Sequence, residues 1–292
     1  ILSGLVGSEM CIRDRHRAGF RLGASVGFKD FLWEALFDPA PGVDMIATAE
    51  RLAVEYGISR EQVDAYALGS HQRALQARDS GWLGEEIVAV GNERFELDGY
   101  QARGIQLPRR IAELAQDSHP RPTDAEALAR LSAIHPGGLQ TAGNSCAVVD
   151  GAAAALVGRA CDCTRPPLAL LRTASVIGVA PERMGIGPAP AIGLLLERSG
   201  LRLEEIGLLE INEAQGAQVL AVSQALGLDP ARLNQRGGSI ALGHPLAATG
   251  LRLVMTLARQ LRNANLRYGI AAACIGGGQG MALLIENPGY QA

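Results

Sequence analysis

The chain carries Gly237-Gly238-Ser239-Ile240-Ala241-Leu242-Gly243-His244-Pro245-Leu246, followed near its C-terminus by Cys274-Ile275-Gly276-Gly277-Gly278-Gln279-Gly280. The first stretch places a histidine on a turn, because glycine and proline flank it. In the second, a cysteine leaves the apolar run 270–273, which predicts a buried strand, and enters a glycine-rich turn. Such a turn can present backbone N–H groups to an oxyanion. A base, a thiol and free N–H donors together favour acyl transfer at a thioester.

Each stretch taken alone also has an ordinary structural explanation. An isolated Gly-His-Pro often marks only a turn, and a buried cysteine is usually a small hydrophobic residue. After the histidine, helical spacing predicts an amphipathic helix that Pro245 opens. Its expected apolar face holds Leu251, Val254, Met255, Ala258 and Leu261, and its polar face holds Arg252, Arg259 and Gln260.

Further motifs precede these two stretches. They are Asn212-Glu213-Ala214, Thr141-Ala142-Gly143-Asn144-Ser145-Cys146, Asp150-Gly151-Ala152-Ala153-Ala154, residues 58–67, and Met45 with Thr48-Ala49-Glu50. Taken in order, the segments resemble the motifs of the thiolase family and cover residues 16–286. The resemblance implies an α/β chain with the five-layered αβαβα thiolase fold. Residues 165–292 would form its C-terminal βαβαβαββ domain, and residues 16–164 a loop domain with a remnant of the N-terminal domain.

The resemblance also implies a reaction, in which a 3-ketoacyl-CoA is cleaved by CoA or two acyl-CoA molecules are condensed. By resemblance, His244 takes the proton of the nucleophilic thiol, and Cys274 exchanges the proton at the α-carbon. Asn212 would orient a water of one oxyanion hole with His244, and the Gly276 N–H would serve a second. CoA is therefore expected as a substrate, with no other cofactor.

The same resemblance implies five contacts to CoA or to the acyl group: Met45, Arg121, Cys146, Ala214 and Gln215. Arg121 would reach the nucleotide end of CoA, although most surface arginines are only solvated. Gln215 stands where the family usually has phenylalanine, and Cys146 stands where many members have serine. These two departures are expected to change the CoA-binding surface more than the class of reaction.

The family holds the acyl group on a cysteine of an Asn-x-x-Cys-x-Ser-Gly type motif, and no such motif occurs in these 292 residues. The only cysteine upstream of the matched segments is Cys11, which lacks the expected glycines. Without that thiolate no covalent intermediate can form. We therefore expect an N-terminally truncated chain that is inactive alone, with the N-terminal half largely missing. Residues 1–15 resemble no family segment and are expected to be a non-native leader.

The composition indicates which kinds of binding partner and which cellular compartment to expect. The net charge of −3 gives no reason to propose nucleic acid, and no apolar run of about 20 residues suggests a membrane span. Five cysteines without a pairing pattern favour reduced thiols in the cytoplasm. Cys161-Asp162-Cys163 is too tight for an ordinary metal pair, so no metal site is expected. A complete protein would form a homodimer or homotetramer, as the family resemblance implies.

Secondary structure is expected to change character near Arg165-Pro166-Pro167. Before it, residues 48–57 and 59–81 predict helices, with a Ser59–Gln62 capping box, and 106–123 predicts an irregular surface segment. After it, strands are predicted over 168–179, 206–211, 269–274 and 281–286, and helices over 190–198 and 217–226. This alternation favours an α/β domain.

Two functions from different classes remain open. One is a thiolase-type acyltransferase, and the other is a non-catalytic CoA-thioester-binding or assembly protein on the same scaffold. Among enzymes, a ketoacyl synthase is the nearest competitor. Its second base is usually a histidine, whereas Cys274 precedes the glycine turn here and favours thiolase.

Overall fold

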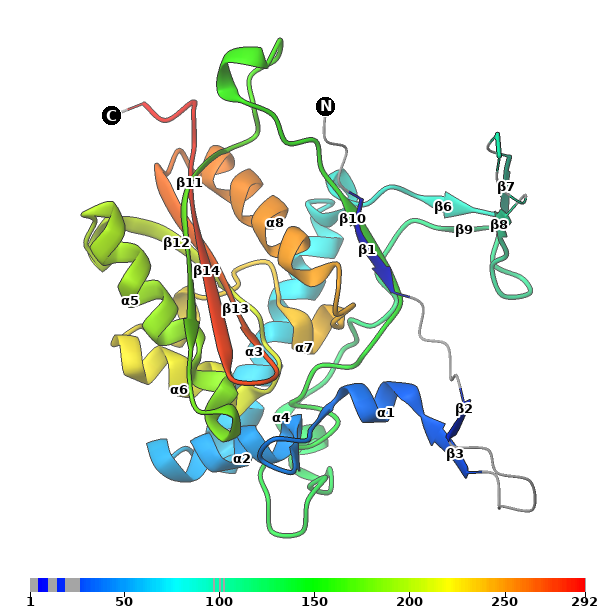
Figure 1. Cartoon of the computed structure of the whole chain (residues 1–292), viewed down its shortest axis with the longest axis vertical. Coiled ribbons are helices and arrows are strands. Elements are labelled where there is room, and N and C mark those ends of the chain that lie inside the picture. The colour runs from blue at the N-terminus through cyan, green and yellow to red at the C-terminus, as the bar shows by residue number, and fades with distance from the viewer. Residues whose placement is uncertain are drawn as a thin grey trace.

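A four-stranded mixed sheet forms the centre of the computed structural model, which describes residues 5–9, 15–18, 27–96, 98–99, 101 and 103–291. The strand order is β11-β14-β13-β12 (Figure 1). The strands are β11 (Leu170–Gly178), β12 (Ile206–Ile211), β13 (Tyr268–Ile275) and β14 (Gln279–Glu286). β12 and β13 run parallel, and the other two pairs are antiparallel. All four strands were predicted, and β12 has the predicted bounds.

Helices cover both faces of this sheet (Figure 1). They are α5 (Pro188–Ser199), α6 (Gly216–Leu226) and α8 (Thr249–Asn263), with the one-turn α7 (Ser239–Leu242) before α8. Side chains alternate along β13. Ile270 and Ala272 pack in the core shared with α5 and α6, while Ala271 packs with Leu253 and Leu257 of α8. The α/β class is therefore confirmed.

The family's expected βαβαβαββ order differs from the observed one in this domain. Within the described residues, no strand lies between α6 and α8, so the order is βαβ, then α6, α7 and α8, then ββ. Leu233 pairs with Leu209 only as an isolated parallel bridge. The bridge does not extend into a strand, because the next residue, Asn234, has a positive φ of 49°. The Asn234 side chain accepts from Ile211 N and donates to Ile211 O.

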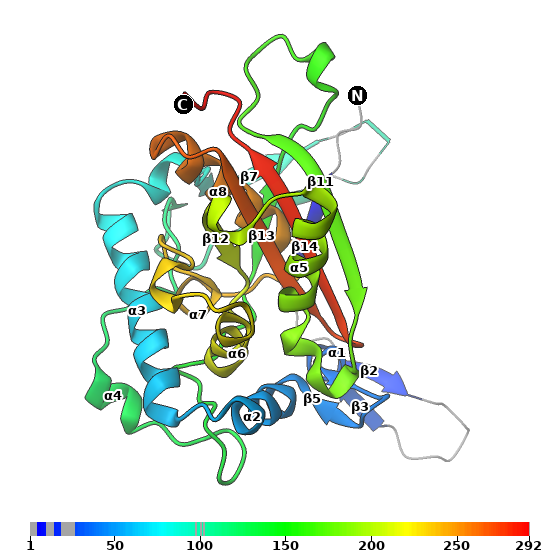
Figure 2. The ribbon, with the colours of Figure 1, turned by 90° about the vertical axis from the view of Figure 1, so that its left-hand side faces the viewer.

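Two helices from the first half of the chain pack against the sheet domain, α3 (Arg60–Asp79) along its side and α2 (Met45–Tyr56) at its lower end in Figure 2. They contact α6 and α7. The predicted capping box of α3 is present, because the Ser59 Oγ accepts from Gln62 N at 3.3 Å and Gln62 Oε1 accepts from Ser59 N at 2.8 Å. Gly57 ends α2 in the left-handed conformation with φ 62°.

The helix after His244 differs from the prediction in its start and its buried face. The helix was predicted to begin at Pro245, but it begins at Thr249. Ala248 N donates to Pro245 O, so residues 245–248 form a separate turn before the helix. Leu253 and Leu257 are buried, whereas Leu251 and Met255 are only half-buried. Gln260, expected on the polar face, is buried and donates to Glu210 Oε1 at 2.7 Å.

The remaining strands and α-helices of the described residues are short. They are β1 (Leu5–Glu9), which pairs with β10 (Gly151–Ala154), β2 (Arg15–Ala18) with β3 (Gly27–Asp30), β4 (Phe37–Asp38) with β5 (Val43–Asp44), β6 (Val90–Gly91) with β9 (Glu113–Leu114), β7 (Glu93–Phe95) with β8 (Arg103–Ile105), and the helices α1 (Phe31–Ala35) and α4 (Ala125–Ala129). The predicted irregular segment 106–123 holds only β9 and is largely exposed. None of the helices in the described ranges has the length and apolarity to span a bilayer. Cys11 lies outside the described residues.

Candidate functional site

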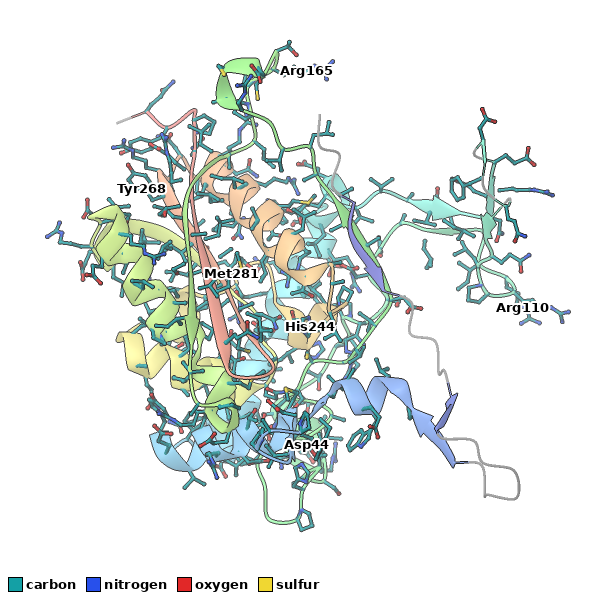
Figure 3. All side chains as sticks on the ribbon, viewed as in Figure 1. Asp44, Arg110, Arg165, His244, Tyr268 and Met281 are labelled. Atoms are coloured by element: carbon teal, nitrogen blue, oxygen red, sulfur yellow. The ribbon has the colours of Figure 1, made fainter. Side chains whose placement is uncertain are left out.

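Two of the predicted catalytic residues lie at the carboxyl ends of neighbouring parallel strands. Asn212 directly follows β12, and its N–H donates to Ala272 O on β13 at 2.9 Å. Cys274 lies two residues further along β13. Figure 3 shows Tyr268, where β13 begins, at the opposite end of the sheet from His244. The carboxyl ends of parallel strands in an open α/β sheet commonly form ligand sites.

His244 lies on the connection between α7 and α8, as the sequence predicted. Its Nδ1 is 2.6 Å from Thr249 Oγ1, and that hydroxyl donates to Pro245 O at 3.0 Å. A hydroxyl has one hydrogen, so Thr249 accepts from Nδ1–H, and Nε2 keeps its lone pair. Burial, with a smaller contribution from the charge of Arg252, lowers the pKa of His244 to about 4. The imidazole is therefore neutral near pH 7, with Nε2 as its basic nitrogen.

Asn212 lies beside that basic nitrogen. Its Nδ2 is 3.4 Å from His244 Nε2, and the residue is 1 % exposed. His244 itself is anchored by its backbone, because its N–H donates to Ala147 O at 2.8 Å. Gly243 precedes it with φ 91°, and a Cβ there would collide with Val149. The pair of His244 and Asn212 predicted from the sequence is thus assembled by the fold.

Cys274 lies in a small apolar cluster with Met184 and Ala214, against which Met45 packs. The thiol is 9 % exposed, and burial raises its pKa to about 12. At neutral pH it therefore carries its proton. Met45 and Ala214, both predicted to contact CoA or the acyl group, thus lie next to the thiol, and an added Cβ at Gly276 would be 3.9 Å from the Met45 side chain.

The glycine turn after β13 is held by a carboxylate that the sequence analysis missed. Gly277 N donates to Asp38 Oδ2 at 2.9 Å, and Asp38 is 6 % exposed. Gly277 and Gly278 have φ values of 82° and 84°, which only glycine adopts easily. Asp38 therefore fixes the turn in which Gly276 was predicted to offer its N–H. It comes from the hairpin β4–β5, far away in sequence, so no local pattern identified it.

The other three residues predicted to contact CoA or the acyl group lie in different surroundings. Cys146 N donates to Ala214 O at 3.1 Å, and burial, together with the neighbouring Cys274, raises the pKa of its thiol to about 12. Gln215 is 5 % exposed and pairs with Ser145 through a β-bridge. Arg121 is exposed, and its described side-chain contact is His119 at 3.4 Å. The structure thus groups Cys146 and Gln215 with Ala214, but it gives Arg121 no contact to this group.

Glu213, between Asn212 and Ala214, is fully buried and connects α3 with the chain segment that leads to His244. Its Oε1 accepts from Tyr66 OH at 2.8 Å and from Asn234 Nδ2 at 2.9 Å. Its Oε2 accepts from Ser70 Oγ at 2.7 Å and from Ile240 N at 3.2 Å. One carboxylate therefore ties α3 to the turn that leads to His244.

A second buried histidine, His71 on α3, makes the stability of the fold depend on pH. It is 1 % exposed, and burial, followed by the charges of Arg121 and His119, lowers its pKa from 6.5 to about 4. Between these values the unfolded chain binds a proton and the folded chain does not, so acid favours unfolding. The His71→Gln variant lacks this linkage. As the pH falls from 7 to 4, wild type should lose about 3 kcal/mol more unfolding free energy than the His71→Gln variant, as measured by chemical denaturation. A constant difference over that range would contradict the assignment.

No group of three or more metal-ligating side chains occurs in the part of the chain that the structure describes. The site as described consists of a basic imidazole nitrogen, a buried amide and a protonated thiol at one edge of the sheet.

The family models agree with this arrangement. The model described as Thiolase, C-terminal domain matches residues 165–287, and the one described as Thiolase, N-terminal domain matches residues 7–160. The chain belongs to the thiolase family. Mitochondrial 3-ketoacyl-CoA thiolase of Bos taurus is 41% identical over 283 residues, with 95% of this chain and 68% of that protein covered. A probable acetyl-CoA acetyltransferase of Escherichia coli (strain K12) is 42% identical over 277 residues, with 93% and 67% covered.

Solved structures show the same similarity. The crystal structure of human mitochondrial 3-ketoacyl-CoA thiolase matches with a TM-score of 0.81 and 38% identity over 95% of this chain and 68% of that one. A crystal structure of that human enzyme in complex with CoA matches with a TM-score of 0.80 and 37% identity over 97% and 67%.

One expectation needs correction. The N-terminal half was expected to be largely missing, yet the N-terminal family model matches residues 7–160 and the bovine relative matches 95% of the chain. The expectation was wrong because it rested on one absent motif, whereas the family models compare whole domains. The non-native leader over residues 1–15 stays a prediction.

Proposed function

We propose that this chain is a thiolase-type acyltransferase that acts on CoA thioesters, by thiolytic cleavage of a 3-ketoacyl-CoA or by the reverse condensation. Family membership and the names of the relatives support the class of reaction. The observation that carries the proposal is the orientation of His244. Its Nδ1 is committed to Thr249, so the basic Nε2 faces Asn212 at the sheet edge that also holds Cys274.

Cys274 is proposed as the acid or base at the α-carbon. In cleavage, its thiol donates a proton to the carbanion of the leaving acetyl-CoA, and its high pKa keeps that proton in place until it is needed. In condensation, its thiolate removes a proton from the methyl group of acetyl-CoA. Because the pKa is about 12, the thiolate fraction grows about tenfold for each pH unit near neutrality.

The oxyanion produced at the thioester oxygen needs donors that are in place before the reaction. We propose Asn212, through a water held with His244, as one source and the Gly276 N–H as another. Asp38 supports the second by holding the glycine turn at Gly277. CoA is proposed as a substrate, with Met45, Ala214, Cys146 and Gln215 near its reactive end and Arg121 near its nucleotide.

The alternative is a CoA-thioester-binding protein without catalysis. The sequence has no Asn-x-x-Cys-x-Ser-Gly type motif, so the acyl-carrying thiol needed for the complete reaction is not identified in these residues. Cytoplasmic location and assembly into homodimers or homotetramers stay predictions.

One partial reaction separates the two functions, because it needs only the residues described above. Acetyl-CoA is incubated with the chain in D2O, and loss of the methyl signal is followed by proton NMR. A thiolase site takes up deuterium faster than buffer alone, because Cys274 removes a proton and returns a deuteron. Saturable binding of acetyl-CoA without exchange would favour the binding protein, and absence of both would contradict both functions.

A further inference from the structure

The hydroxyl of Ser239 lies between the charged end of Arg252 and the amide of Asn212. Ser239 opens α7 and is fully buried. Arg252 Nη2 donates to Ser239 Oγ at 3.2 Å, and Ser239 Oγ donates to Asn212 Oδ1 at 2.6 Å. Arg252, predicted on the polar face of its helix, is half-buried in this contact.

The direction of these two hydrogen bonds follows from their donors. A guanidinium can only donate, so Ser239 accepts from Arg252. Its single hydrogen is then left for Asn212 Oδ1, which fixes the carbonyl end of that amide. The amide's NH2 end therefore faces His244 Nε2, 3.4 Å away.

We infer that Ser239, oriented by Arg252, is a positioning residue that determines which end of the Asn212 amide faces His244. The inference deepens the proposed function, on which its catalytic part rests. With the amide reversed, an acceptor would face the lone pair of Nε2. That contact is repulsive unless His244 carries its proton on Nε2, and such a histidine cannot take a proton from a thiol.

Arg252 also lies close to a buried glutamate of the sheet. Its Nη1 is 3.8 Å from Glu210 Oε2, and Glu210 is 1 % exposed on β12. Gln260 Nε2, two turns further along α8, donates to Glu210 Oε1 at 2.7 Å. Glu210 thus lies beside the arginine that orients the serine, two residues before Asn212 on the same chain segment, and burial raises its pKa to about 7.

The test compares variants of the whole chain by the protonation state of each nitrogen of the His244 ring. Nitrogen-15 NMR of histidine-labelled protein distinguishes protonated from unprotonated ring nitrogens, and the His244→Gln variant identifies the His244 signals. Wild type should show Nε2 unprotonated. Ser239→Ala should populate the Nε2–H form, in which the Thr249 hydroxyl turns from Pro245 O to donate to Nδ1, so the two ring-nitrogen signals should exchange their protonated and unprotonated shifts.

Three further variants distinguish positioning from general destabilisation. Ser175→Ala removes another buried hydroxyl, which donates to Ala191 O at 2.6 Å, and should leave the His244 signals unchanged. Arg252→Met should behave like Ser239→Ala, and Arg252→Lys, which keeps a donor, should recover most of the wild-type signal.

The ring signals can be read even if the wild-type chain shows no exchange, so failure of the proposed function leaves this test intact. Wild-type His244 signals in both Ser239→Ala and Arg252→Met would overturn the inference.

Discussion

Replacing Cys274 with alanine is expected to slow deuterium exchange into acetyl-CoA by about 100- to 10,000-fold, the usual contribution of a positioned acid or base. The residues that pack against the thiol, Met184, Ala214 and Met45, have no titratable group, and burial raises the pKa of the neighbouring Cys146 thiol to about 12 as well. Binding of acetyl-CoA, measured by calorimetry, should change little. The difference is best measured at pH 8, where more thiolate is present in wild type.

Cys161→Ala is the matched control for this prediction. It removes an exposed thiol on the connection between β10 and β11 and should keep the wild-type exchange rate. Substituting His244 with alanine should also slow exchange, since the water proposed to donate to the oxyanion loses one of the two residues that hold it. Rates close to wild type in Cys274→Ala would exclude the thiol as the base.

The Glu213→Gln variant is expected to lose about 3 kcal/mol or more of unfolding free energy. The carboxylate accepts four hydrogen bonds, two on each oxygen, and its side chain is fully buried. Glutamine keeps the shape but replaces one acceptor oxygen with an NH2 group. Two donors then lose their acceptor and the other two keep a neutral one, and a hydrogen bond to a charged group contributes about 1.5 to 3 kcal/mol. Urea denaturation followed by circular dichroism measures the loss.

Glu197→Gln provides the comparison, because Glu197 is exposed on α5 and its substitution should cost at most about 0.5 kcal/mol. Equal stability of the two variants would show that the network around Glu213 contributes little. A large loss would instead explain, in physical terms, why a glutamate follows the site amide at Asn212: it secures the turn that carries His244.

Local patterns predicted much of the fold. The apolar run of β12 and the reciprocal Ser59–Gln62 cap each act within a few residues, and both formed as expected. His244 and Cys274 were recognisable because glycine and proline flank one and glycines follow the other. The side chains that support His244 and Cys274 were not recognisable from the sequence. Asp38 reaches the glycine turn from more than 200 residues away, and no spacing rule reports such a contact.

The start of α8 shows a second limit. Proline suits the first turn of a helix, which favoured Pro245 as the opening residue. The backbone instead forms a separate turn, in which Ala248 N and Thr249 N both donate to Pro245 O. Only tertiary packing determines this choice, since it brings the Thr249 hydroxyl to His244 and buries Leu253 against the sheet. Gln260 was misplaced for the same reason, because its buried partner lies on β12.

The short connection 245–248 has a consequence for how the chain can vary in length. One turn of α8 carries both Thr249 and Arg252, which hold His244 and, through Ser239, Asn212. A single inserted residue before Thr249 would rotate these side chains by about 100° around the helix axis and release both at once. Insertions should therefore be rejected here and tolerated in the exposed segment 155–169, whose length no site contact depends on.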